Sequence, residues 1–285
     1  MNIRTALVLA AVALAGTSAA AQTPGFSSRV EAVRVDVLVT DRGRILRDLK
    51  PADFEVFDNG VAQAVDLVIF EKLPVRVVLV LDMSDSVAGE RLEHLRAAGL
   101  MLLDQLAADD EAALVTFSHI VRIDAPLTAD RARVRAALQR ADGFGRTALV
   151  DAIHTGIVIG ESGIGRSLLI VFSDGVDTSS WLPAERVLDA AGRTDMVAYF
   201  VSAGEKRRGA FDRELTSLTG GSLIEIASTK DLGATFVQIL EEFRQRYIVS
   251  YTPRGVPKGG WHRLEVRVKG RRATVQARPG YHAGQ

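Results

Sequence analysis

The sequence predicts an α/β fold: a doubly wound, mostly parallel six-stranded sheet with one antiparallel edge strand, plus a small β domain formed by both chain ends. Three observations support this prediction. In the middle of the chain, unbroken apolar runs alternate with amphipathic segments, as in parallel sheets covered on both faces. One pair of predicted strands there is separated by only three residues. Both chain ends instead alternate apolar and polar residues, as half-buried strands do.

The first 21 residues have the pattern of a secretory signal. Arg4 precedes an unbroken apolar stretch, and small residues at Ala19 and Ala21 come before Gln22. We expect cleavage after Ala21 and an exported protein, either periplasmic or secreted. The alternative is an uncleaved anchor, although the apolar stretch is shorter than the ~20 residues that span a bilayer. No later stretch predicts an integral membrane span.

Composition excludes several classes of function. The 285 residues include 35 Lys and Arg and 35 Asp and Glu, so no overall charge favours nucleic acid or an anionic membrane as a partner. The chain contains no cysteine, which excludes disulfides, thiol catalysis and cysteine-ligated zinc. A hydrophobic content of 47% is enough for a substantial core.

Alternating strands are predicted at both ends of the mature chain. "VRVDVLVT" (33–40) is the first, and "FEVFDNGVAQAVDLVIF" predicts two strands around the turn sequence Asp58-Asn59-Gly60. Near the other end, "YIVSYTP", "HRLEVRVKG" and "ATVQARPGYHA" alternate in the same way. We therefore expect an N-terminal β segment (22–74) that packs with a C-terminal β segment (245–285), with an α/β domain (75–244) between them.

Within the α/β domain, strands and helices are expected in strict alternation except at one place. The predicted parallel strands are 75–81, 112–117, 167–173, 196–201 and 223–226. The predicted helices are 90–107, 130–140, 148–159, 183–193, 211–218 and 231–246. Residues 121–124 follow the second strand after only Ser118, His119 and Ile120, which is too short for a parallel crossover. This segment is therefore predicted as the antiparallel edge strand.

Three loops that follow buried strands or precede helices carry hydroxyl and carboxyl groups. "LVLDMSDSVAGERL" contains Asp82, Ser84 and Ser86, "GFGRTALVDAI" contains Thr147, and "LLIVFSDGVDTSS" contains Asp174. Ligands of open α/β sheets bind beyond the carboxyl ends of the strands. Hard oxygen ligands of this kind suit Mg²⁺ or Mn²⁺ better than zinc or copper. The sequence therefore predicts a metal site with an open position for a partner's carboxylate.

These residues carry a resemblance to a known family. "DMSDS" resembles the D-x-S-x-S signature of the von Willebrand factor type A (VWFA) domain, and Thr147 and Asp174 match the remaining positions of its metal-ion-dependent adhesion site (MIDAS). The resemblance covers roughly residues 75–244, and the flanking β segments resemble the bacterial exported VWFA-related group. It implies that Ser84, Ser86 and Thr147 contact Mg²⁺, Mn²⁺ or Ca²⁺ directly or nearly so. It also implies that Asp82 and Asp174 act mainly through coordinated waters, and that a partner's Asp or Glu completes the shell.

Simpler interpretations of the same residues remain open. Taken alone, the D-x-S-x-S stretch is also compatible with a strand-to-helix turn in which Ser86 caps the helix, and Thr147 is also a suitable N-cap. We interpret Asp85 and Asp177 as solvated loop carboxylates. Trp181 either lines the rim of the site or covers the adjacent helix.

We expect a non-enzymatic protein-binding module rather than an enzyme. A Mg-dependent phosphatase of the haloacid-dehalogenase type is the main alternative, but Ser84 stands where that chemistry needs an acid/base aspartate. No G-x-S-x-G elbow, P-loop or complete dinucleotide fingerprint occurs. A structural scaffold with a retired metal site is the third possibility. The expected partner is a protein that offers Asp or Glu, and no nucleic acid.

Overall fold

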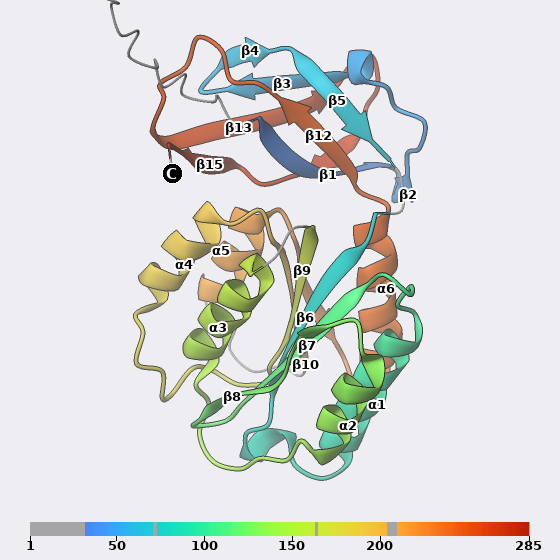
Figure 1. The fold of residues 1–285 in the computed structure, drawn as a ribbon, viewed down its shortest axis with the longest axis vertical. Helices are drawn as coiled ribbons and strands as arrows, with labels where there is room; N and C mark the ends of the chain where they lie inside the picture. The colour runs from blue at the N-terminus through green and yellow to red at the C-terminus, as the bar shows by residue number, and fades with distance from the viewer. Residues whose placement is uncertain (1–31, 71–72, 163–164, 204–209, 285) are drawn as a thin grey trace, which may run out of the picture. The chain divides into compact units, whose positions relative to one another are not determined.

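A six-stranded sheet forms the centre of the computed structural model, which describes residues 32–70, 73–162, 165–203 and 210–284. The predicted signal peptide and its cleavage site lie outside these residues. The strand order is β11-β10-β9-β6-β7-β8 (Figure 1). The strands are β6 (Val75–Asp82), β7 (Glu111–Phe117), β8 (Val121–Thr128), β9 (Arg166–Phe172), β10 (Val197–Ala203) and β11 (Leu223–Ile226). All neighbours are parallel except β7 and β8, which confirms the predicted antiparallel edge strand.

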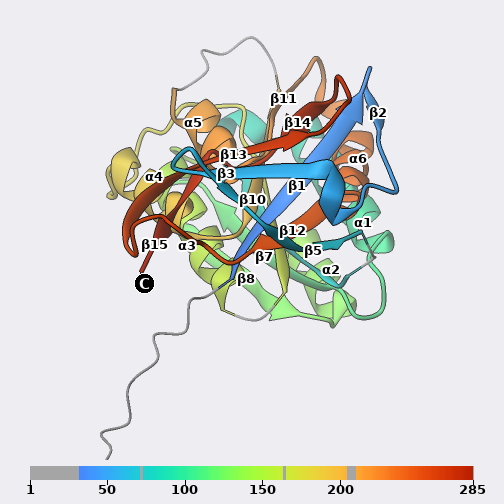
Figure 2. The ribbon, with the colours of Figure 1, turned by 90° about the horizontal axis from the view of Figure 1, so that it is seen from above.

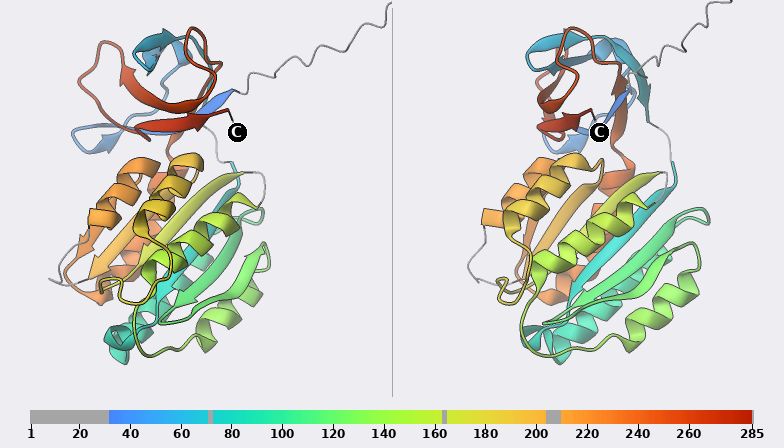
Figure 3. Two further views of the ribbon diagram at one scale, coloured as in Figure 1. Left: turned by 90° about the vertical axis from the view of Figure 1, so that its left-hand side faces the viewer. Right: turned by 60° about the vertical axis from the view of Figure 1, so that its left-hand side comes forward.

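Helices cover both faces of this sheet (Figure 3). The helices are α1 (Glu90–Asp104), α2 (Arg131–Arg140), α3 (Leu149–Glu161), α4 (Ala184–Arg193), α5 (Ala210–Thr219) and α6 (Leu232–Arg244). Val77, Leu79 and Leu81 of β6 pack with residues of α1, α2 and α6. Val78 and Val80 point to the other face and pack with α3, α4 and α5. The period of two in a strand thus explains why β6 is apolar without interruption from Val77 to Leu81.

Strands from the two ends of the chain pair with one another in two further sheets. One has the order β14-β1-β12-β5 with β2 beside β1, and the other has the order β15-β13-β3-β4. Their bounds are β1 (Val33–Asp41), β2 (Arg44–Ile45), β3 (Phe54–Asp58), β4 (Val61–Gln63), β5 (Val65–Ile69), β12 (Tyr247–Tyr251), β13 (Gly260–Val268), β14 (Thr274–Gln276) and β15 (Gly280–Ala283). One buried apolar cluster contains residues of both sheets, so the sheets pack face to face, and their strands cross in Figure 2.

The prediction of two strands around Asp58-Asn59-Gly60 is wrong in one respect. The turn forms as expected, with positive φ at Asn59 (47°) and Gly60 (81°). The chain after it, however, divides at Ala64 into β4 and β5. β4 pairs with β3, whereas β5 pairs with β12 in the other sheet. An apolar pattern does not show which sheet a strand joins, so this division could not be read from the sequence.

The carboxyl ends of the parallel strands lie away from the paired end strands. Arg166, at the amino end of β9, forms an ion pair with Asp36 of β1, whereas Asp174 lies just beyond the other end of β9. Residues 31–285 together form one compact unit. Within the described part of the chain, no helix combines the length and the apolar character that a membrane crossing needs.

Candidate metal centre

The D-x-S-x-S stretch begins at the carboxyl end of β6. Asp82 is the last residue of this strand, and Ser84 and Ser86 follow in a loop with a short 3-10 turn (Asp85–Val87). Helix α1 starts only at Glu90, and Gly89, with a φ of 71°, is its N-cap residue. Ser86 therefore does not cap α1, and the interpretation of this stretch as a simple helix cap is wrong.

Four of the five predicted site residues lie within hydrogen-bond reach of a neighbour in the same cluster. The Ser84 and Ser86 hydroxyl oxygens are 3.2 Å apart, and the Ser86 hydroxyl donates to Asp174 Oδ1 at 2.5 Å. The backbone N–H of Ser84 donates to Asp82 Oδ1 at 2.8 Å. Residues 88 positions apart in the chain thus meet because β6 and β9 are adjacent parallel strands.

Thr147 is buried beside this cluster, in the loop before α3. Its N–H donates to Thr178 Oγ1 at 3.0 Å, and its carbonyl accepts from the N–H of Thr178 at 2.8 Å. A Cβ atom placed on Gly175 would lie 3.6 Å from Thr147 Oγ1, so this hydroxyl faces the residue after Asp174. The N-cap residue of α3 is Ala148 rather than Thr147. Among the described residues, no hydrogen bond joins the Thr147 hydroxyl to the other four.

Asp85 and Asp177 accept hydrogen bonds from groups in or near the site loops, in addition to any contact with solvent. Asp85 Oδ1 accepts from the N–H of Gly145 at 2.7 Å, which fastens the D-x-S-x-S loop to the loop that carries Thr147. Asp177 Oδ1 accepts from the Ser180 hydroxyl at 2.5 Å and from the N–H of Val150 at 3.3 Å. These two carboxylates therefore hold the site loops together.

The two carboxylates of the site are buried, and their charges are balanced only in part. Asp82 is fully buried and the Asp174 side chain is 1% exposed. Burial raises the pKa of the Asp82 carboxyl above its ordinary value, and the charge of Asp174 adds to this rise. Hydrogen bonds from Ser173 and Ser84 lower the pKa of Asp82 and so oppose it. A nearby positive charge would therefore stabilise the ionised form of the Asp82 carboxyl.

The sequence did not point to two residues that contact the site. The Ser173 hydroxyl donates to Asp82 Oδ2 at 2.6 Å, and Arg91 Nη1 donates to Asp174 Oδ2 at 2.6 Å. Ser173 directly precedes Asp174, but a serine at a strand end is unremarkable by itself. Arg91 carried a clearer signal, because a basic residue in the first turn of a helix opposes the helix dipole.

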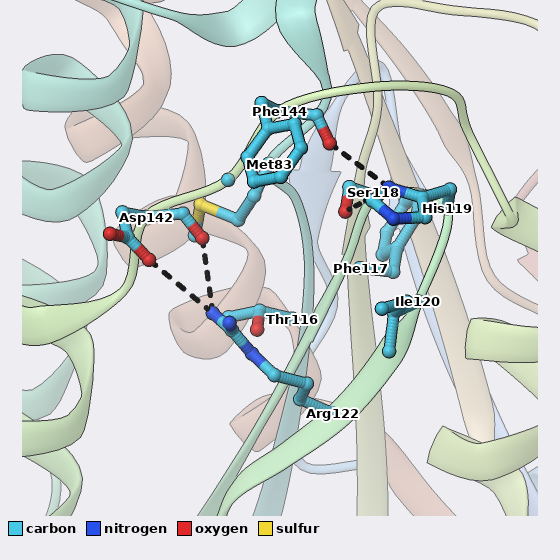
Figure 4. Close-up of a pocket in the computed structure, with 10 residues that line it drawn as sticks. Met83, Thr116, Phe117, Ser118, His119, Ile120, Arg122, Asp142 and Phe144 are labelled. Carbon is cyan, nitrogen blue, oxygen red and sulfur yellow. Dashed lines mark hydrogen bonds and ion pairs between the residues drawn. The ribbon is translucent and has the colours of Figure 1, made fainter.

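A small pocket adjoins the site on the side of β7 and β8 (Figure 4). Its volume is about 120 Å³, and Met83, which lies between Asp82 and Ser84, contributes to its wall. Pockets that bind drug-sized ligands commonly measure roughly 300 to 1,000 Å³, so this pocket is smaller than a usual site for an organic ligand. Phe144 (72% exposed) and Trp181 (93% exposed) lie on the loops that carry Thr147 and Asp174. Trp181 therefore does not cover the adjacent helix.

The donor set suits a hard divalent cation. It comprises two carboxylates and three hydroxyls. One of the carboxylates, that of Asp174, already contacts a positive charge, the Arg91 guanidinium. Within the described ranges, no three His, Cys, Asp or Glu side chains gather as a metal-binding group, so soft or imidazole-rich sites are not represented there. Oxygen-only sets fit Mg²⁺, Mn²⁺ or Ca²⁺.

Comparisons with known proteins agree with this architecture. Residues 77–177 match the von Willebrand factor type A domain family. An uncharacterised protein from Synechocystis is 33% identical over 88 residues, which is 30% of this chain and 21% of that protein. The match thus spans about a fifth of that relative's length.

Solved structures share the fold at low sequence identity. A von Willebrand factor type A protein from Catenulispora acidiphila aligns with a TM-score of 0.57 and 15% identity, covering 81% of this chain and 72% of that one. Proximal thread matrix protein 1 from the mussel byssus, in a structure with a zinc-occupied MIDAS motif, gives a TM-score of 0.56 and 12% identity, covering 65% and 49%. At these identities the likeness concerns the fold alone.

Residues 77–177 thus match the von Willebrand factor type A domain family, and the α/β fold is that of such domains. Domains of this family often mediate protein–protein interactions.

Proposed function

We propose that this protein is an exported, non-enzymatic binding module that captures an acidic residue of a protein partner at a metal-ion-dependent adhesion site. The observation that carries the proposal is the meeting of Asp82, Ser84, Ser86 and Asp174 beyond the carboxyl ends of β6 and β9, with Thr147 facing Gly175 next to them. All five side chains offer oxygen atoms. Their convergence from three loops favours a ligand site over a structural turn.

Each residue has a distinct part in the proposed site. Ser84, Ser86 and Thr147 would hold the cation through their hydroxyls, and the buried carboxylates of Asp82 and Asp174 would neutralise it, mainly through waters. A cation held largely by neutral hydroxyls would supply an electrophilic centre that attracts a carboxylate from outside. The relative with a zinc-occupied MIDAS motif supports this use of the fold. Mg²⁺ is our first choice, ahead of Mn²⁺ and Ca²⁺.

The environment of Asp82 favours binding over phosphatase-like chemistry. The residue two positions later is Ser84, whose backbone N–H donates to Asp82 Oδ1. The Asp82 oxygens thus accept hydrogen bonds from Ser84 and Ser173, and a serine is a poor proton donor in place of the acid that such hydrolases use. A non-enzymatic role is therefore the simpler proposal.

The domain arrangement completes the proposal. We propose a signal peptide at 1–21, a von Willebrand factor type A domain at 75–244, and β segments 22–74 and 245–285 that pack together. Pairing of β1 with β12 and of β3 with β13 supports the last point. Periplasmic or secreted protein would reach its partner without a membrane span of its own.

A calorimetric titration tests the metal site directly. Residues 22–285 are titrated with Mg²⁺ and Mn²⁺, alongside the Asp82→Ala and Thr147→Ala variants. Saturable binding that both variants lose is the expected result. Asp142→Asn is the matched control, because Asp142 lies in the same loop as Thr147 but its side chain is 80% exposed.

Partner capture tests the second half of the proposal. Partner binding should require the metal and should be lost in Asp82→Ala, while circular dichroism shows an intact fold. An affinity that stays unchanged in EDTA would contradict metal-dependent capture.

A further inference from the structure

Arg91 is the charged group that closes the site from the helix side. It lies in the first turn of α1, and its Nη1 donates to Asp174 Oδ2 at 2.6 Å and to the Ser86 carbonyl at 3.2 Å. The Arg91 side chain is 51% exposed, whereas the Asp174 carboxylate beneath it is 1% exposed. The Arg91 guanidinium can therefore move into solvent, whereas the Asp174 carboxylate stays buried.

Arg91 balances a charge that the rest of the site leaves uncompensated. The donors to Asp82 are neutral, namely the Ser84 N–H and the Ser173 hydroxyl. Asp174 receives one neutral donor, Ser86, and the Arg91 guanidinium. Over the described part of the chain, no other basic side chain forms an ion pair with either carboxylate. A buried carboxylate without a counter-charge is unfavourable, so the Arg91 contact stabilises the site in the absence of metal.

Helix stability does not explain the position of Arg91. The positive end of the helix dipole favours acidic residues in the first turn, and Glu90 and Glu93 meet that preference in α1. An arginine between them is mildly unfavourable for the helix. Its contacts point instead to the metal centre.

We propose that Arg91 is an internal counter-cation that competes with the divalent metal for Asp174 and thereby lowers the metal affinity of the site. This inference rests on the proposed function, because it concerns the regulation of the same site. A half-exposed arginine pair is weak and exchanges readily, so a divalent ion can displace it. After displacement, the Arg91 guanidinium still lies a few ångströms from the bound ion and repels it. This repulsion should weaken the metal-binding constant by roughly a factor of ten.

Three variants separate charge from structure. Arg91→Gln removes the cation, and Arg91→Lys keeps the unit charge. Arg135→Gln removes an equivalent charge from α2, where Arg135 forms an ion pair with Asp104 of α1. The probe is Mn²⁺ alone, titrated into the purified protein by calorimetry at low ionic strength.

We expect Arg91→Gln to bind Mn²⁺ about tenfold more tightly than the unaltered protein. Arg91→Lys should stay within about threefold of it, and Arg135→Gln should not change the affinity. The advantage of Arg91→Gln should shrink as salt is added, because salt screens an exposed charge. Metal binding that appears only in Arg91→Gln would also support the proposal.

Equal or weaker binding in Arg91→Gln would overturn the inference and leave the metal site itself intact. A gain of the same size in Arg91→Lys would also overturn it, because the charge would then not be the cause. Absence of Mn²⁺ binding in every protein would overturn both this inference and the proposed metal site, so the two failures can be told apart.

Discussion

Two buried carboxylate clusters in this protein differ in how their hydrogen bonds are completed. Asp58, at the end of β3, is fully buried and accepts from three side chains of the C-terminal strands. His262 Nδ1 lies 2.7 Å from Asp58 Oδ1, and the hydroxyls of Tyr251 and Tyr281 donate to Oδ2 at 2.9 and 2.8 Å. Each donor is itself buried. This cluster thus joins the two ends of the chain through side chains that are all buried.

The cluster at Asp82 and Asp174 is built from loops and is closed on one side by a half-exposed group. Its donors are short serine hydroxyls, a backbone N–H and Arg91. Burial of a carboxylate therefore does not by itself mark a functional site. The two clusters differ in their hydrogen-bond donors. Asp58 accepts from large side chains of neighbouring strands, whereas Asp82 and Asp174 accept from small serine groups and from the half-exposed Arg91. The second cluster lies at the carboxyl ends of parallel strands, where ligands of open α/β sheets bind.

The largest expected effect is on stability, at Asp58. Asp58→Ala should lower the free energy of unfolding by about 3 to 5 kcal/mol, because two buried tyrosines and a buried histidine lose their acceptor. Urea denaturation measures the loss. Asp82→Ala is the comparison variant, and its loss should be much smaller because the change also removes a poorly balanced buried charge. Equal losses of unfolding free energy in Asp58→Ala and Asp82→Ala would contradict the proposed difference between the two clusters.

Mg²⁺ should stabilise the folded protein through the site at Asp82 and Asp174, and not through the cluster at Asp58. At a Mg²⁺ concentration about 100 times the dissociation constant, linkage adds about 2.7 kcal/mol to the free energy of unfolding. The thermal midpoint should therefore rise with Mg²⁺ and fall again with EDTA. Asp82→Ala should show neither change, whereas Tyr281→Phe should keep both. A midpoint that Mg²⁺ leaves unaltered in the parent protein would contradict the proposed site.

Removing one donor of the closed cluster should have an intermediate, pH-dependent effect. Tyr281→Phe should cost about 1 to 2 kcal/mol, since Asp58 loses one of its hydrogen bonds. Burial, together with the hydrogen bond to Asp58, raises the pKa of Tyr281 above its ordinary value of 10.0. The stability that this tyrosine contributes is thus complete below about pH 10 and declines as the pH rises toward its folded value.

Unfolding measured from pH 8 upward tests the sign of this effect. The parent protein should lose stability above about pH 10, and Tyr281→Phe should lose it less steeply. Identical slopes would mean that Tyr281 ionises as freely in the folded protein as in the unfolded chain.

The smallest effect is expected at the rim of the open site. Trp181 is 93% exposed, so Trp181→Ser should change the free energy of unfolding by no more than about 0.5 kcal/mol. Its Mg²⁺ affinity should match that of the parent protein. Calorimetry and urea denaturation check both points. A stability loss above about 1 kcal/mol would mean that the indole packs on the protein after all.

Much of the fold could be predicted because its signals are local. The apolar run of β6 reflects a strand buried on both faces, and the Asn59-Gly60 turn follows from the positive φ that these residues tolerate. Helix ends were less certain: α1 ends at Asp104 and α6 at Arg244, a few residues before the ends predicted from periodicity. The split of the chain at Ala64 depends on pairing with two different sheets, which no local pattern records.

For the candidate site, the sequence by itself determined which residues we propose as metal ligands, because Asp82, Ser84 and Ser86 are tied to a strand end by their spacing, and Thr147 and Asp174 each occupy a loop of their own. Only the tertiary structure decided what surrounds them. Ser173 donates to Asp82, Arg91 covers Asp174, and Asp85 fastens the loop of Thr147. These contacts join residues 60 to 91 positions apart. They arise only when β6 and β9 pair and α1 packs beside them, so local sequence could not show that Arg91 contacts Asp174.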